Sequence, residues 1–68
     1  MNVPEIDSLW RHKNGDFYRV ILIANKDSKR IDEYPVTVVY KRLCDETIWC
    51  RPFYRWLGSF ENVTFLGD

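Results

Sequence analysis

The residues with the clearest chemical potential lie on one predicted β-hairpin, Tyr34 to Pro52, in which two β-branched and aromatic runs are joined at Asp45-Glu46. Four of its side chains are aromatic or cationic, namely Tyr40, Arg42, Trp49 and Arg51. A two-residue turn at Asp45-Glu46 pairs Tyr40 with Arg51 and places all four side chains on the same face. Two guanidinium groups beside an indole and a phenol favour stacking on nucleobases or contact with an acidic loop of another protein.

A purely structural interpretation of this hairpin face stays open beside the binding one. In it, Trp49 belongs to the core and the arginines lie over the indole, each contact contributing about 0.5–1 kcal/mol. Three further residues follow within one predicted turn and extend the surface if it is exposed. The candidate partner surface is therefore Tyr40, Arg42, Trp49, Arg51, Tyr54, Arg55 and Trp56.

Catalytic residues are not indicated by the rest of the chain. The single histidine, His12, has no Ser-His-Asp order, second histidine or acid pair to work with, and Asp45-Glu46 are most simply turn residues. One histidine and two cysteines are too few for a zinc site within one chain. The expected hairpin register does not pair Cys44 with Cys50, so both are predicted to be reduced thiols. We therefore predict no enzymatic activity, no metal and no cofactor.

Length, charge and hydropathy narrow the class of protein. A chain of 68 residues makes one domain. Ten Lys and Arg balance ten Asp and Glu, which argues against a non-specific nucleic-acid binder but leaves room for a local basic patch. No run approaches the roughly 18 apolar residues of a membrane span, and Met1 to Asp7 is unlike a signal peptide. A cytoplasmic location, away from membranes, is expected.

The predicted elements are short strands with one late turn of helix. Strands are expected over residues 9–12, 17–24, both arms of the hairpin and 60–66, with one helical or 3₁₀ turn over 53–57. Asn14-Gly15 favours a tight turn with positive φ at both positions. Residues 20–24 are apolar on both faces, as in a central strand covered on two sides. Residues 1–8 are predicted to be a flexible lead-in, and residues 9–66 a single domain.

This order of elements predicts a mainly β fold, a small five-stranded SH3-like barrel, in preference to an OB-fold, which needs more residues and a fuller helix. So short a chain buries only about 60% of the surface that its unfolded form exposes, so its core must be rich in large apolar side chains. The expected core residues are Phe17, Tyr18, Tyr40, Trp49, Phe60 and Phe65.

Several segments also carry a family resemblance. They are Trp10-Arg11-His12-Lys13-Asn14-Gly15, Phe17-Tyr18-Arg19-Val20, Ala24, Val38-Val39-Tyr40 and Trp49-Cys50-Arg51-Pro52. Together they resemble a small bacterial and phage family catalogued as domain of unknown function 1653, over roughly residues 9–63. The sequence of residues 34–40 is most similar to the phage-encoded members of the family. Residues 25–33 and Cys50 depart from the sequence pattern that is usual in the family. The resemblance implies a small SH3-like β domain and supplies no activity.

Two functions from different classes follow as hypotheses. The first is a non-catalytic phage-type accessory protein that binds a host or phage protein in the bacterial cytoplasm and inhibits or redirects it. The second is a small β-barrel that binds single-stranded nucleic acid or RNA through the aromatic and cationic side chains of the hairpin. The protein is expected to be a monomer or a homodimer, because small barrels have strand edges and the turn over 53–57 is apolar.

Overall fold

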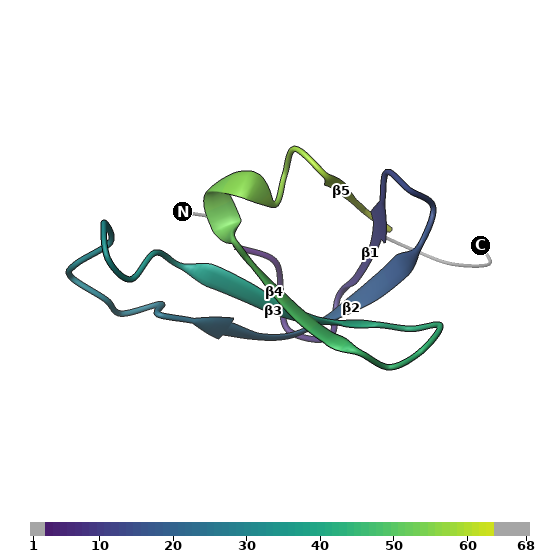
Figure 1. Cartoon of the computed structure of the whole chain (residues 1–68), viewed down its shortest axis with the longest axis horizontal. Coiled ribbons are helices and arrows are strands. Elements are labelled where there is room, and N and C mark those ends of the chain that lie inside the picture. Colours follow the sequence, from purple (N-terminus) through teal and green to yellow (C-terminus); the bar gives the residue numbers. More distant parts are fainter. Residues whose placement is uncertain (1–2, 64–68) are drawn as a thin grey trace.

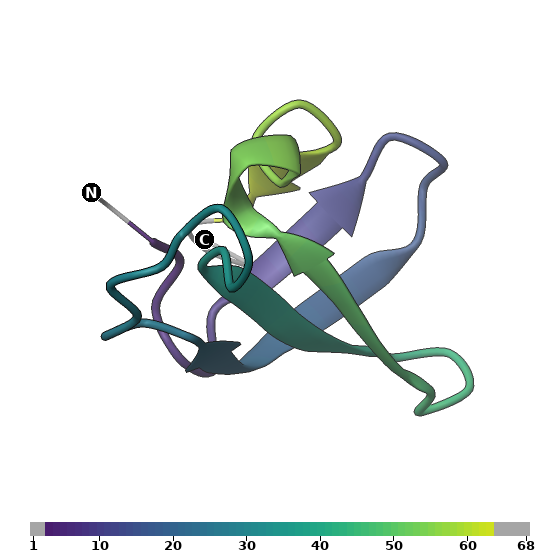
Figure 2. The same ribbon diagram turned by 60° about the vertical axis from the view of Figure 1, so that its left-hand side comes forward.

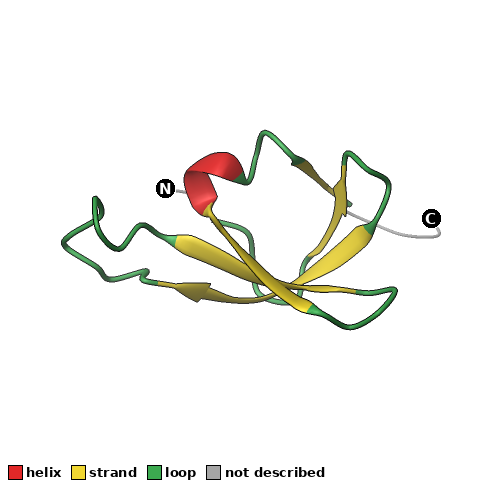
Figure 3. Ribbon diagram, in the orientation of Figure 1, coloured by secondary structure: helices red, strands yellow, loops and turns green. Residues whose placement is uncertain are grey.

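The computed structural model describes residues 3–63, which form one antiparallel sheet with a single 3₁₀ turn (Figures 1 and 3). In chain order the elements are β1 (Leu9–His12), β2 (Phe17–Ala24), β3 (Thr37–Arg42), β4 (Ile48–Pro52), the 3₁₀ turn η1 (Phe53–Arg55) and β5 (Phe60–Asn62). The strand order in the sheet is β4-β3-β2-β1-β5. The prediction of a mainly β, five-stranded fold with one late 3₁₀ turn is therefore confirmed.

The sheet curls so that its two ends approach the same side of the molecule. η1 and the edge strand β5 lie over one face of β2 and β3, in green and yellow in the upper part of Figures 1 and 2. Strand β2 carries a bulge, because its register with β3 shifts between Val20 and Leu22. The arrangement is consistent with a small barrel-like domain, and the narrower SH3-like classification stays a prediction.

Within residues 3–63, seven buried hydrophobic side chains form the core on the covered face: Trp10, Tyr18, Val20, Val38, Tyr40, Trp56 and Phe60. The predicted burial of Tyr18, Tyr40 and Phe60 is confirmed. The prediction for Phe17 was wrong, because Phe17 precedes the inward-facing Tyr18 on the strand and so points to the opposite face, where it is 42% exposed. Phe65 lies outside the described residues.

Trp49 was also wrongly predicted to be buried. It shares the inward face with Tyr40, its direct cross-strand partner, yet it is 49% exposed. The reason is its position near the free end of the β3–β4 hairpin, beyond the segments that cover the core. Its place at the centre of the core is taken by Trp56, whose ring stacks on Phe60 at a centroid distance of 3.8 Å and meets Tyr40 edge-on at 4.9 Å.

The hairpin register differs by two residues from the predicted one. Tyr40 pairs with Trp49 rather than with Arg51, and Arg42 donates its backbone N–H to the carbonyl oxygen of Thr47 at 2.9 Å. The loop therefore holds residues 43–46, and Glu46 takes a positive φ of 60°. Because a shift of two residues leaves every side chain on its original face, the shared face of the four candidate residues is retained.

One local prediction is corrected near the N-terminus, in the loop between β1 and β2. The β1–β2 loop has positive φ only at Gly15 (98°), since His12 and Asp16 pair around a three-residue loop rather than a two-residue one. The described part of the predicted flexible lead-in, residues 3–8, is joined to the sheet: Asp7 donates its backbone N–H to the Val20 carbonyl oxygen at 2.8 Å. The predicted domain end at residue 66 lies outside the described residues.

No helix within residues 3–63 has the length and the apolar character needed to cross a membrane.

Candidate functional site

Two of the seven predicted surface residues lie in the core instead. Tyr40 is 4% exposed and Trp56 is fully buried, so neither side chain is available to a partner. The physical reason is that β3 turns Tyr40 toward the residues that η1 brings over the sheet. Burial raises the pKa of the Tyr40 phenol, and the neighbouring Arg51 guanidinium opposes this shift.

Arg51 covers the edge of the core. Its guanidinium carbon lies 5.2 Å from the centre of the Phe60 ring, and the side chain is half-buried. This contact is a cation–π interaction, which contributes about 0.5–1 kcal/mol at a partly exposed site. For Arg51 the geometry therefore matches the structural interpretation of the hairpin face.

Arg42, Asp45 and Thr47 form a polar chain that ends at the exposed indole of Trp49. Arg42 Nη2 lies 2.5 Å from Asp16 Oδ2, and Arg42 Nη1 lies 3.6 Å from Asp45 Oδ2. The Thr47 hydroxyl donates to Asp45 Oδ1 at 2.7 Å and accepts the indole N–H of Trp49 at 2.6 Å. An exposed tryptophan with its indole N–H already bonded is held in one orientation, so it presents a fixed apolar face.

The hydrogen bonds and the ion pair of this chain favour the ionised form of the Asp45 carboxyl group. The Thr47 hydroxyl, then the Thr47 backbone N–H and the Arg42 guanidinium, lower the pKa of Asp45. A lowered folded-state pKa means that the stabilisation is present above the ordinary carboxyl pKa and is lost as pH falls through the lowered value.

We expect Thr47→Val, which keeps the side-chain shape but removes the hydroxyl, to raise the pKa of Asp45 toward its ordinary range. The same change should shift the indole N–H resonance of Trp49, because its acceptor is gone. An NMR titration of the Asp45 carboxyl carbon in both proteins measures the first effect. An unchanged Asp45 pKa and an unshifted indole resonance in the variant would contradict the polar chain.

The remaining two predicted surface residues are exposed but stand apart from Trp49. Tyr54 is 76% exposed on η1, and Arg55 is exposed beside it. Three residues of strand, about 10 Å, separate Trp49 from the start of η1. The structure therefore divides the predicted surface into the hairpin end with Trp49 and a second patch on η1 with Tyr54 and Arg55.

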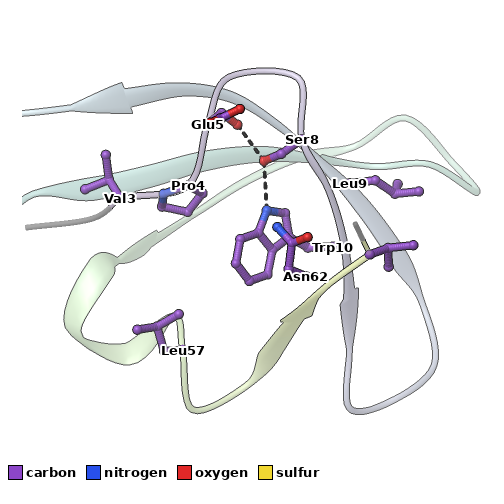
Figure 4. Close-up of a pocket in the computed structure, with 9 residues that line it drawn as sticks. Val3, Pro4, Glu5, Ser8, Leu9, Trp10, Leu57 and Asn62 are labelled. Carbon is purple, nitrogen blue, oxygen red and sulfur yellow. Dashed lines mark hydrogen bonds between the residues drawn. The ribbon is translucent and has the colours of Figure 1, made fainter. Parts of the chain in front are cut away.

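Sequence reasoning missed a hollow of about 580 Å³ between the N-terminal segment, β1 and β5, lined by Val3, Pro4, Glu5, Ser8, Leu9, Trp10, Leu57, Asn62 and Val63. Figure 4 shows the indole N–H of Trp10 directed at Ser8 Oγ, at 2.8 Å, and the Ser8 hydroxyl directed at the Glu5 carbonyl oxygen, at 2.5 Å. These bonds hold residues 5–8 against β1. Among the described residues of the lining, Glu5 is the one titratable side chain, so residues 3–63 supply no acid–base pair to the hollow.

His12 and the cysteines occupy structural or solvent-exposed positions. His12 Nδ1 accepts the backbone N–H of Asn14 at 3.1 Å, and its ring meets that of Phe60 edge-on at 4.9 Å. Cys44 and Cys50 are both exposed free thiols. In residues 3–63 no group of three or more His, Cys, Asp or Glu side chains is placed to hold a metal ion.

The family model described as "Protein of unknown function (DUF1653)" matches residues 8–64, which covers every strand of the sheet. The chain belongs to the DUF1653 family. No curated protein and no solved structure matches the chain.

The sheet of this DUF1653 domain has a second surface that sequence reasoning missed. On the face turned away from the core, four large apolar side chains are exposed: Phe17 (42%), Leu22 (46%), Leu43 (37%) and Ile48 (59%). The apolar character of residues 20–24 predicted a strand covered on both faces, but Leu22 is uncovered within the part of the chain that the structure describes. The signal in the sequence was that Phe17 and Leu22, on the outer face of β2, are large and apolar, whereas an exposed strand face is usually polar.

Proposed function

We propose that this DUF1653 domain is a non-catalytic protein-binding module of the phage type, which inhibits or redirects a host or phage protein in the bacterial cytoplasm. The observation that carries the proposal is the exposed, hydrogen-bonded Trp49 at the end of the β3–β4 hairpin. Tryptophan is the residue type most enriched among side chains that dominate binding energy at protein interfaces.

The surroundings of Trp49 support a protein contact. Its neighbour Ile48 is 59% exposed and Leu43, across the loop, is 37% exposed, so the hairpin end is apolar on both faces. The bond from Trp49 to Thr47 removes part of the cost of ordering the indole on binding. A rigid aromatic side chain with apolar neighbours is the usual centre of a protein interface.

The first test is an affinity pull-down of the tagged chain from bacterial lysate, with and without nuclease, read by mass spectrometry. We expect a defined host or phage protein to be retained after nuclease treatment. Recovery that disappears with nuclease would refute the proposal, because the captured proteins would then be held through nucleic acid.

Binding of single-stranded nucleic acid is the second candidate, and one observation favours it. Strands β1 to β4 contain five basic residues, Arg11, Arg19, Lys41, Arg42 and Arg51, and no acidic residue. If phosphate neutralisation drives binding, the affinity for an oligothymidine strand should fall steeply between about 50 and 300 mM salt. A flat response over that range would remove this candidate.

A further inference from the structure

The outer face of the sheet, which we define as the side of β2, β3 and β4 turned away from the core, is apolar around a pair of cations. Its exposed apolar residues are Phe17, Leu22, Leu43 and Ile48. Arg19 and Lys41 lie directly opposite each other on β2 and β3, in the row between Phe17 and Leu22. Because residues on one face of a strand are about 7 Å apart, both cations lie one step from the apolar side chains.

One end of the outer face is hollowed. A depression of about 470 Å³ is lined mainly by apolar surface from Leu9, Phe17 and Leu43, beside Gly15, Asp16 and Cys44. Phe17 and Leu43 are joined across the strands, since the Leu43 backbone N–H donates to the Phe17 carbonyl oxygen at 3.0 Å. The depression therefore has a rigid floor, and it is large enough for an apolar side chain of another molecule.

The two central cations are not balanced on this face. Like charges directly opposite each other in a sheet are destabilising, and β1 to β4 contain no acidic side chain to relieve them. Arg19 donates one N–H to the backbone carbonyl oxygen of Asp7 at 2.8 Å and takes part in no ion pair within residues 3–63. Lys41 takes part in none of the ion pairs within residues 3–63.

We propose that the outer face binds an acidic amphipathic segment of another protein, with its apolar side chains on Phe17, Leu22 and Leu43 and its carboxylates on Arg19 and Lys41. Charge complementarity identifies this occupant, because an anionic partner relieves the repulsion within the cation pair while the apolar side chains leave water. The Trp49 side chain lies on the core side of the same sheet, so it is not part of this site.

Two other occupants fit the face less well. A second copy of this chain, related by a two-fold axis, would bring two Arg19–Lys41 pairs together and add to the repulsion. Single-stranded nucleic acid needs aromatic rings on which bases stack, whereas this face offers one aromatic ring, Phe17, among aliphatic side chains.

The test is a selection of displayed random peptides on the intact chain, with two variants as comparison baits. The variant Arg19→Ser/Lys41→Ser removes the cation pair, and Leu22→Ser removes one exposed apolar side chain. Both are expected to fold, because these side chains are exposed or half-buried and the double change relieves repulsion. Before the selection, the far-ultraviolet circular dichroism spectrum and a urea midpoint no lower than that of the parent chain establish that both variants are folded.

We expect the enriched peptides to combine Asp or Glu with large apolar residues. They should bind the double variant about tenfold more weakly and Leu22→Ser more weakly as well. They should bind Trp49→Ala as strongly as the parent chain, which distinguishes this site from the hairpin site. Failure to enrich any sequence, enrichment without an acidic excess, or equal binding to the double variant would overturn the proposal.

The alternative occupants are tested with the same variants. Sedimentation equilibrium of the parent chain that shows a dimer, converted to a monomer by Leu22→Ser, would assign the face to a second copy and overturn the proposal. If the parent chain binds an oligothymidine strand and the double variant does not, the outer face would be assigned to nucleic acid and the proposal would also be overturned. We expect neither result.

Discussion

The change Trp56→Ala is expected to cause a large loss of stability in the domain. Trp56 is fully buried, stacks on Phe60 at 3.8 Å and meets Trp10 at 5.4 Å and Tyr40 at 4.9 Å, so its ring packs the segment after η1 against β1, β3 and β5. Removing a buried tryptophan costs about 3–5 kcal/mol. A domain of this length has a total stability of about 3–10 kcal/mol, so between about a third and all of it is lost.

Urea denaturation followed by circular dichroism measures this loss. The control Tyr54→Ala removes an aromatic ring two residues away that is 76% exposed, and we expect its urea midpoint to stay close to that of the parent chain. Trp56→Phe should be intermediate, because Trp56 Nε1 has no hydrogen-bond partner within residues 3–63 and only ring volume is lost. A folded Trp56→Ala protein with the parent's midpoint would contradict the described core.

The second large effect is expected on binding rather than on stability. If Trp49 is the centre of the partner surface, Trp49→Ala should weaken the complex by about 2 kcal/mol or more, which is about thirtyfold in the dissociation constant. The indole is half exposed and lies beyond the core, so the domain should remain folded. Titration calorimetry of the purified chain and the protein recovered after nuclease treatment measures the change.

Tyr34→Ala is the matched control for that experiment. Tyr34 is an aromatic residue of similar exposure, 50%, but it lies in the long β2–β3 loop (residues 25–36), which extends away from the hairpin end in Figure 1. The change Tyr34→Ala should leave the affinity for the recovered protein unchanged. An unchanged affinity for Trp49→Ala, with the fold intact, would refute the hairpin surface. If Leu22→Ser then weakened the same complex, the outer face would be the contact.

Local signals in the sequence determined the secondary structure. The alternating and β-branched runs predicted β2 and the hairpin strands, and Gly15 marked the β1–β2 turn. The residues after Pro52 predicted one helical or 3₁₀ turn, because proline ends strand pairing and the segment before Gly58 is short, and the structure has a 3₁₀ turn there. These features depend on neighbours in the chain, so a single sequence contains the information for them.

Only the tertiary structure decided which aromatic rings are buried. Tyr40 and Trp49 are cross-strand partners on one face, and pattern alone treats them alike. They differ because the segment from η1 to β5 brings Trp56 and Phe60 over Tyr40 and leaves Trp49 beyond the edge. The tertiary structure also decided that Arg19 lies opposite Lys41, because this pairing depends on the β2–β3 register across a long loop. The burial of a side chain and the pairing of charges across strands depend on segments that are distant in the sequence. The local spacing of residues therefore does not specify them.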